Sequence, residues 1–301
     1  MRKKTKIQLL IASFLVVVGA LIFVGVMSVS GWDFTKLSTY KFETNTHEIT
    51  EIYTSIDVST NEANVELVPS NGEKTSVVCY EKTKIKHSVE IKDGVLKIRA
   101  VDRREWYDYI GFAFVSPKIT VYIPQGNYDN VTIKTDTGNV KIPDSYSFNN
   151  LSISVKTGNV TTLAQAKTLK IESSTGNISV KNVATTELAV STSTGNISIN
   201  DVSANNVTLS ASTGDISLNT VVATEKLSVK TSTGNVGLTK CDAGEIYIST
   251  STGNVNGSVL TAKNFKANSN TGSVSIPQSD ANAGICEIKV VTGNIKITIA
   301  E

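Results

Sequence analysis

The sequence has few of the side chains on which enzyme and metal sites are usually built. In 301 residues it contains two histidines, His47 and His87, three cysteines, and no arginine after Arg104. Acid–base and glycan-cleaving sites need clustered carboxylates, often with such residues beside them. The carboxylates after residue 126 are dispersed, and the close pair Asp242 and Glu245 is typical of a solvated surface. The sequence therefore predicts no enzyme, no metal site and no cofactor.

Strong charge and aromatic side chains are also scarce. The formal net charge is +2 and aromatic residues make up 6% of the chain. Without a basic stripe, nucleic acid is not expected as a partner. Three cysteines are too few, and odd in number, for a disulfide framework. The low aromatic content suits a narrow core filled by Val, Ile and Leu.

The feature that dominates the sequence is a recurring Thr-Gly pair followed by a small polar residue. Asn follows seven of the glycines, Asp215 follows one and Ser273 follows one. Successive glycines lie 18 to 21 residues apart. The nine corner glycines are Gly138, Gly158, Gly176, Gly195, Gly214, Gly234, Gly253, Gly272 and Gly293. A period near 19 indicates a solenoid whose single coil is too small to bury its own apolar face.

Apolar residues alternate with polar ones on both sides of each glycine. Around Gly195, Leu188 and Val190 precede the glycine, and Ile197 and Ile199 follow it. Alternation with period two is typical of half-buried strands. We expect an all-β protein, a parallel β-solenoid of about 19 residues per coil, right-handed by the usual hand of parallel crossovers. Nine coils stacked at about 4.8 Å would form a rod roughly 40 Å long.

The residue after each glycine has its own role in this interpretation. Calcium-binding β-rolls place Asp at such turns, because the ion needs several hard oxygen ligands. Here Asn predominates, and we expect a ladder of side-chain amides bonded to the coils above and below. Cys241 and Cys286 lie seven residues from a corner glycine, where other coils carry Val or Leu, so both should be buried core residues. The final coil, with Ile295 to Ile299, should form the exposed end of the rod.

The N-terminal third divides into an anchor, a linker and a cap. Residues 1–6 form a basic tail, and 7–29 an uncharged apolar run long enough to span a membrane. The basic flank predicts a cytoplasmic N-terminus and an extracellular C-terminal domain, in a single-pass membrane protein. A cleaved signal peptide is the alternative. Residues 30–50 are expected to be a juxtamembrane linker, 51–125 a β-rich cap and 126–301 the solenoid.

Two surfaces are candidates for contact with a partner. The first is a loop in the cap with the residues Arg103, Arg104, Trp106, Tyr107, Tyr109, Phe112 and Phe114. It either folds over the open end of the apolar core or forms an aromatic–arginine surface for a partner or for lipid headgroups. The second is the regular array of outward Ser and Thr on the strands, which Lys156, Glu172 and Lys230 interrupt.

These features together resemble a known bacterial family. The Ser-Thr-Gly-Asn corners, the segment 117–124 (PKITVYIP) and the anchor followed by Gly-Trp-Asp-Phe at 31–34 are similar to the "putative adhesin" β-strand-repeat family. The family is a domain of unknown function with membrane-anchored members in Gram-positive bacteria. The resemblance covers roughly residues 31–301 and implies exposure at the cell surface, with no catalytic residues to transfer.

The sequence leaves several functions open. The favoured one is a membrane-anchored structural or adhesive module at the cell envelope, contacting a cell-wall glycan or an envelope protein. The resemblance also suggests a non-catalytic accessory protein of an envelope-stress sensing system. A polysaccharide-processing enzyme is the least favoured alternative. The oligomeric state is left open.

Overall fold

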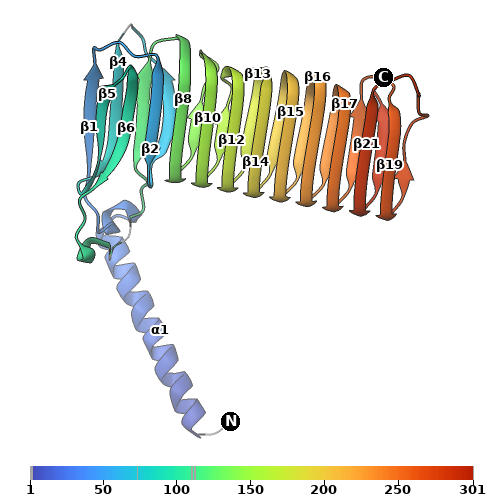
Figure 1. Ribbon diagram of the computed structural model, residues 1–301. Coiled ribbons are helices and arrows are strands. Elements are labelled where there is room, and N and C mark those ends of the chain that lie inside the picture. Colours follow the sequence, from blue (N-terminus) through green and yellow to red (C-terminus); the bar gives the residue numbers. More distant parts are fainter. Residues whose placement is uncertain (1–2, 73, 110, 112, 301) are drawn as a thin grey trace.

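The computed structural model describes residues 3–72, 74–109, 111 and 113–300. One long helix, α1 (Lys3–Val29), leads into two strand-rich parts of a single rod (Figure 1). Short 3-10 helices, η1 (Phe34–Leu37) and η2 (Trp106–Tyr109), lie where α1 meets the rod. Among the described residues, α1 is the one helix long and apolar enough to cross a membrane.

The body of the rod is a solenoid of parallel strands that pair in register from one coil to the next. At most corners a long strand is followed by a second strand. Each of the two strands pairs with the equivalent strand of the next coil (Figure 1). These strands are β8 (Gly126–Thr137), β9 (Val140–Ile142), β10 (Tyr146–Thr157), β11 (Val160–Thr162), β12 (Gln165–Thr175), β13 (Ile178–Ala184), β14 (Glu187–Thr194), β15 (Ile197–Thr213), β16 (Ile216–Thr233), β17 (Val236–Thr252) and β18 (Val255–Val259). The predicted β-solenoid is confirmed.

The core is a set of apolar columns that run along the rod. Leu169, Leu188, Val207 and Leu227 occupy one column and are almost completely buried. Fully burying one such side chain stabilises the folded state by about 1.5–3 kcal/mol. Because the coils on either side provide much of this burial, each coil is stabilised mainly by its neighbours. Cys241 and Cys286 are buried in such columns, as predicted.

The first coil lies upstream of the first Thr-Gly pair. Strands β2 (Ser55–Thr60) and β3 (Asn64–Pro69) pair in parallel with β8 and β9. Their corner has Ala63 where later coils have glycine, and Asn64 occupies the ladder position. A search for Thr-Gly pairs misses this coil, although the pattern Thr-Asn-Glu-Ala-Asn at 60–64 keeps the asparagine.

A mixed sheet closes the end of the rod next to α1. Its strands are β1 (Phe42–Ile49), β4 (Thr75–Lys82), β5 (Ile85–Lys92), β6 (Val95–Asp102) and β7 (Lys118–Ile123). Strands β6 and β7 stack in parallel on β2 and β3, whereas β1–β4, β4–β7 and β5–β6 pair antiparallel. Strand β1 falls within the stretch expected to be a linker, so ordered structure begins before residue 50. Antiparallel pairing ends the parallel stack and protects its edge.

The C-terminal coils do not stack in chain order. Strands β21 (Ile285–Thr292) and β22 (Ile295–Ile299) insert between β17–β18 and the outermost strands β19 (Asn264–Thr271) and β20 (Val274–Ser275) (Figure 1). The expectation that Ile295–Ile299 would form the exposed end is therefore wrong. The inward side chains of β21 are Cys286, Ile288 and Val290, whereas β19 offers Phe265, Ala267 and Ser269. The more apolar coil is buried on both sides, and the more polar one meets solvent.

Candidate contact surfaces

The aromatic loop between β6 and β7 is held in place by ion pairs at its base. Arg104 pairs with Asp102 at 2.6 Å, and Lys84 pairs with Asp108 at 2.6 Å. The Lys84 ammonium lowers the pKa of the Asp108 carboxyl below its usual value, and the Arg104 guanidinium does the same for Asp102. The Asp108 carboxylate also accepts the backbone N–H of Glu105. These bonds fix the short helix η2, which carries Trp106 and Tyr107.

Trp106, Tyr107 and Phe114 of this loop lie outside the core, and Phe114 is connected to α1 through Phe34. Trp106 is 77% exposed, and Tyr107 and Phe114 are about half exposed, at 54% and 50%. Phe114 lies 6.1 Å from the ring of Phe34, which lies 6.5 Å from Phe23 of α1. The loop therefore does not fold over the open end of the apolar core, which was one of the two sequence interpretations, because Trp106, Tyr107 and Phe114 are half exposed or more and Phe114 packs on Phe34 outside the core.

The remaining predicted loop residues divide into three cases. Arg103 is exposed, and its backbone N–H donates to the carbonyl of Lys84. Tyr109 ends η2. Phe112 lies outside the described residues.

A cavity of about 290 Å³ beside the loop is lined by Tyr40, Lys82, Lys84, Arg104 and Asp108, among others. Lys82, Lys84 and Arg104 in this lining are already paired with carboxylates, so they are not free to bind an anion.

The nine corner glycines cannot be exchanged for other residues without strain. Their φ angles lie between +141° and +155°, a region that L side chains rarely adopt. A Cβ on Gly195 would lie 2.1 Å from the carbonyl oxygen of Gly176 in the coil below. Conformation and close stacking therefore both require glycine at this position.

The residue after each glycine forms a ladder, but with different donors from those expected. The backbone N–H of Asn196 donates to Oδ1 of Asn177 at 2.8 Å, and that of Asp215 donates to Oδ1 of Asn196. Amide-to-side-chain bonds between neighbouring coils occur at Asn235 and Asn254. Because the side chain acts chiefly as an acceptor, a carboxylate fits equally well, which explains Asp215.

A continuous row of threonines runs beside this ladder. The residues before the glycines are all exposed and pair in register along the rod. In spatial order they are Thr137, Thr157, Thr175, Thr194, Thr213, Thr233, Thr252, Thr292 and Thr271. Within the described part of the chain, none of their hydroxyls has a hydrogen-bond partner. We call these nine residues the threonine row; each hydroxyl in it is free to donate and to accept.

The threonine row was visible in the sequence but was interpreted as a corner motif. Thr precedes every corner glycine. Sequence reasoning looked for the contact face on the strands, where charges such as Lys230 interrupt it. Between Ser174 and Ser251 the row is instead flanked by exposed serines at the residue before each threonine. In these central coils, the two residues before each corner glycine present two hydroxyls and no charge.

A family model covers the coils and corners described above. The family model described as Toastrack DUF4097 matches residues 53–239 and 220–300. The chain belongs to this family. The sequence resemblance to the "putative adhesin" β-repeat domains of unknown function is thereby confirmed. No curated protein matches the chain.

Three solved structures are similar to this Toastrack chain at low sequence identity. A "putative adhesin" from Bacteroides fragilis is 18% identical, with a TM-score of 0.41, covering 86% of this chain and 97% of the other. One from Parabacteroides merdae is 13% identical, with a TM-score of 0.48, covering 86% and 96%. A "putative lipid binding protein" from Parabacteroides distasonis is 16% identical, with a TM-score of 0.42, covering 85% and 97%. At these identities the likeness concerns the fold alone.

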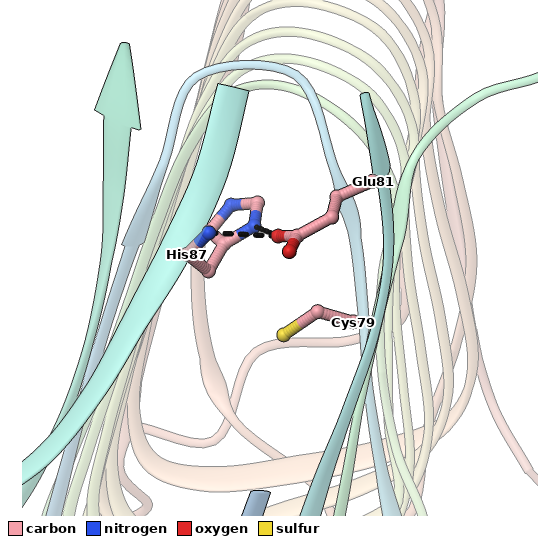
Figure 2. A group of neighbouring side chains, drawn as sticks. All are labelled: Cys79, Glu81 and His87. Carbon is pink, nitrogen blue, oxygen red and sulfur yellow. Dashed lines mark hydrogen bonds and ion pairs between the residues drawn. The ribbon is translucent and has the colours of Figure 1, made fainter. Parts of the chain in front are cut away.

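One polar cluster in the Toastrack cap was missed by sequence reasoning. Cys79, Glu81 and His87 are buried between β4 and β5, with ligand atoms within 4.8 Å of one another (Figure 2). Among the described residues it is the one such group of metal-ligating side chains. Glu81 and His87 come from the two arms of a hairpin, so the separation of six residues was the available signal.

The bonds within this cluster favour a structural role. His87 Nδ1 lies 2.7 Å from Glu81 Oε2, and His87 Nε2 lies 2.9 Å from Thr60 Oγ1. The other Glu81 oxygen accepts from the amide of Asn45. Two ligands of one tetrahedral zinc ion would lie roughly 3.3 Å apart, given bonds near 2.0 Å. His87 Nδ1 and Glu81 Oε2 are closer than this, at the distance of a direct hydrogen bond. Burial raises the pKa of the Cys79 thiol to about 12, which disfavours the thiolate that binds metal or attacks substrate.

Proposed function

We propose that this Toastrack protein is a membrane-anchored module that holds a hydrogen-bonding surface outside the cell membrane and binds a cell-envelope glycan along it. The single observation that carries the binding role is the threonine row, an exposed array of unpaired hydroxyls repeated at each coil. Glycans are rich in hydroxyls and carry little apolar area, so a regular hydroxyl array matches their chemistry. A repeated weak contact also gains affinity through multivalency.

The anchor part of the proposal is supported by the N-terminal helix. The most apolar 18-residue stretch of the helix at 4–29 has a mean hydropathy of 2.9 and is not buried inside the protein. Arg2, Lys3, Lys4 and Lys6 precede it, which supports a cytoplasmic N-terminus and an outward solenoid. We further propose the division into tail (1–6), anchor (7–29), linker (30–50), cap (51–125) and solenoid (126–301), with β1 and the first coil added to the folded body.

The chemistry on the surface gives no support to a catalytic role. The most reactive side-chain types in the described chain, the three thiols, are all buried. The enzyme alternative therefore stays the least favoured. An accessory role in envelope-stress sensing is the second candidate, and it would act through the exposed Trp106 and Tyr107 beside the anchor.

The glycan proposal is tested on full-length protein in nanodiscs. Thr194, Thr213 and Thr233 are changed together to Val, which removes three hydroxyls and keeps the β-branched shape. At about 0.5–1.5 kcal/mol per hydrogen bond, binding to purified cell-wall polysaccharide should weaken about tenfold or more. The matched control changes the same three residues to Ser and should keep most of the affinity. Equal binding by the Val and Ser variants would show that another surface carries the contact.

A further inference from the structure

We propose that four aromatic side chains form a lipid-binding surface, which we call the membrane seat. These residues, Phe34, Trp106, Tyr107 and Phe114, lie in the interfacial layer of the bilayer leaflet on the solenoid's side and bind phospholipid there. The inference rests on the proposed membrane anchor and deepens it. It gives the protein a second lipid contact, separate from the spanning helix. The segments that carry the rings, η1 and the loop between β6 and β7, lie beside the end of α1 (Figure 1), and the rings of Phe34 and Phe114 are 6.1 Å apart.

The depth of these rings follows from the helix geometry. The 23 apolar residues 7–29 extend about 34 Å at 1.5 Å per residue, whereas the hydrocarbon layer is about 30 Å thick. Phe23 is six residues before Val29 and therefore lies about 9 Å below the end of α1. Phe34 contacts Phe23, and Phe114 contacts Phe34. The chain of rings thus reaches the level at which hydrocarbon meets headgroups.

The exposed groups have the chemistry of that interface. Trp and Tyr concentrate at headgroup level because their rings are apolar and their N–H or O–H groups still reach polar partners. Trp106 and Tyr107 lie edge to face at 5.8 Å and are exposed to 77% and 54%. Arg103 is exposed beside them and Lys36 lies on η1, so cations are available for phosphate groups.

A bilayer is a better occupant than a protein partner, because the anchor already brings it there. Any membrane that surrounds α1 at Phe23 also reaches the ring of Phe34, which packs against Phe23, and through it Phe114. A protein partner would have to displace that lipid first. Trp106, Tyr107 and Phe114 are half exposed or more, and none of them belongs to the buried core of the rod. The consequence is a rod held by two lipid contacts, which restricts its tilt over the membrane.

The experiment uses Trp106 as a depth probe. Trp32→Phe leaves Trp106 as the sole tryptophan, and the full-length variant is placed in nanodiscs with and without bromine-labelled phosphatidylcholine. The control variant carries Trp32→Phe, Trp106→Phe and Tyr247→Trp, which moves the single tryptophan to β17, far along the rod. Interfacial Trp106 should be quenched at least about twofold more than the control and should emit at shorter wavelength.

The outcomes separate this inference from the anchor itself. Protein that washes off the bilayer at alkaline pH would overturn the anchor. Protein that stays bound while Trp106 is quenched no more than the Tyr247→Trp control would overturn the seat alone. A photo-crosslinker at position 106 in native membranes provides the second readout: adducts with lipid support the seat, and a discrete protein adduct without bromolipid quenching overturns it in favour of a protein partner.

Discussion

At the scale of single residues, the corner glycines carry the heaviest structural constraint. Gly195→Ala forces a Cβ to within 2.1 Å of the Gly176 carbonyl oxygen at a φ of +141°. We expect the free energy of unfolding to fall by about 3 kcal/mol or more, because a strained backbone and a clash with rigid backbone add together. Urea unfolding followed by circular dichroism measures it.

A second glycine supplies the matched control. Gly237 lies in β17, has no strained φ, and a Cβ there would meet open space. Gly237→Ala should leave stability unchanged or raise it by up to about 1 kcal/mol. If Gly195→Ala were as mild as Gly237→Ala, the close stacking of corner backbones would be wrong.

The second corner of the coil contains a strained threonine. Asn182, Asp201, Thr220 and Lys240 recur once per coil with φ between +51° and +55°. Asn and Asp tolerate this left-handed region, whereas a β-branched residue does so poorly. Thr220→Asn should therefore raise the unfolding free energy by about 0.5–1 kcal/mol in the same assay. Thr208→Asn on strand β15 should lower it instead, and a gain at both sites would point to a general effect of asparagine.

At the scale of elements, the order of the last strands is the sharpest departure from expectation. In the observed order Ser249 pairs with Lys289, and Lys289 pairs with Asn268 on its other side. The variant with Ser249→Cys and Lys289→Cys should form a disulfide, because in-register strands are about 4.8 Å apart. The variant with Ser249→Cys and Asn268→Cys should not, since two strand spacings exceed the reach of the bond. Disulfide formation only in the second variant would show that these strands stack in the order of the chain, contrary to the structure.

Periodicity predicted the repeating elements but could not predict their order or their ends. The strands at 264–271 and 285–292 both end in a Thr-Gly corner, so the period treats them as equivalent. The two strands differ in the apolar content of their inward side chains. This difference matters only when both strands can occupy the position beside β17. Strand β1 has the sequence FETNTHEI, whose polar inward residues gave no apolar alternation. The approach of Phe34 to Phe114 joins residues 80 positions apart, and no local pattern encodes it.

At the scale of the whole molecule, the rod is a sum of interchangeable coils. Deleting residues 196–214 removes one coil of 19 residues and joins Gly195 to Asp215, which restores a Thr-Gly-Asp corner. Because each coil contacts only its neighbours, the shortened protein should fold, unfold cooperatively, and lose about 4.8 Å of length. Small-angle scattering and thermal unfolding measure this outcome.

Removing a coil also tests whether binding is spread along the rod. The deletion takes away one threonine of the row, Thr213, without altering the others, so glycan affinity should fall only slightly. Deleting residues 196–205 instead removes half a coil and brings Gly214 to nine residues after Gly195, so the next corner falls half a coil too early to stack on its neighbours and folding should fail. Complete loss of binding in a folded one-coil deletion would mean that a single site, rather than a repeated surface, holds the ligand.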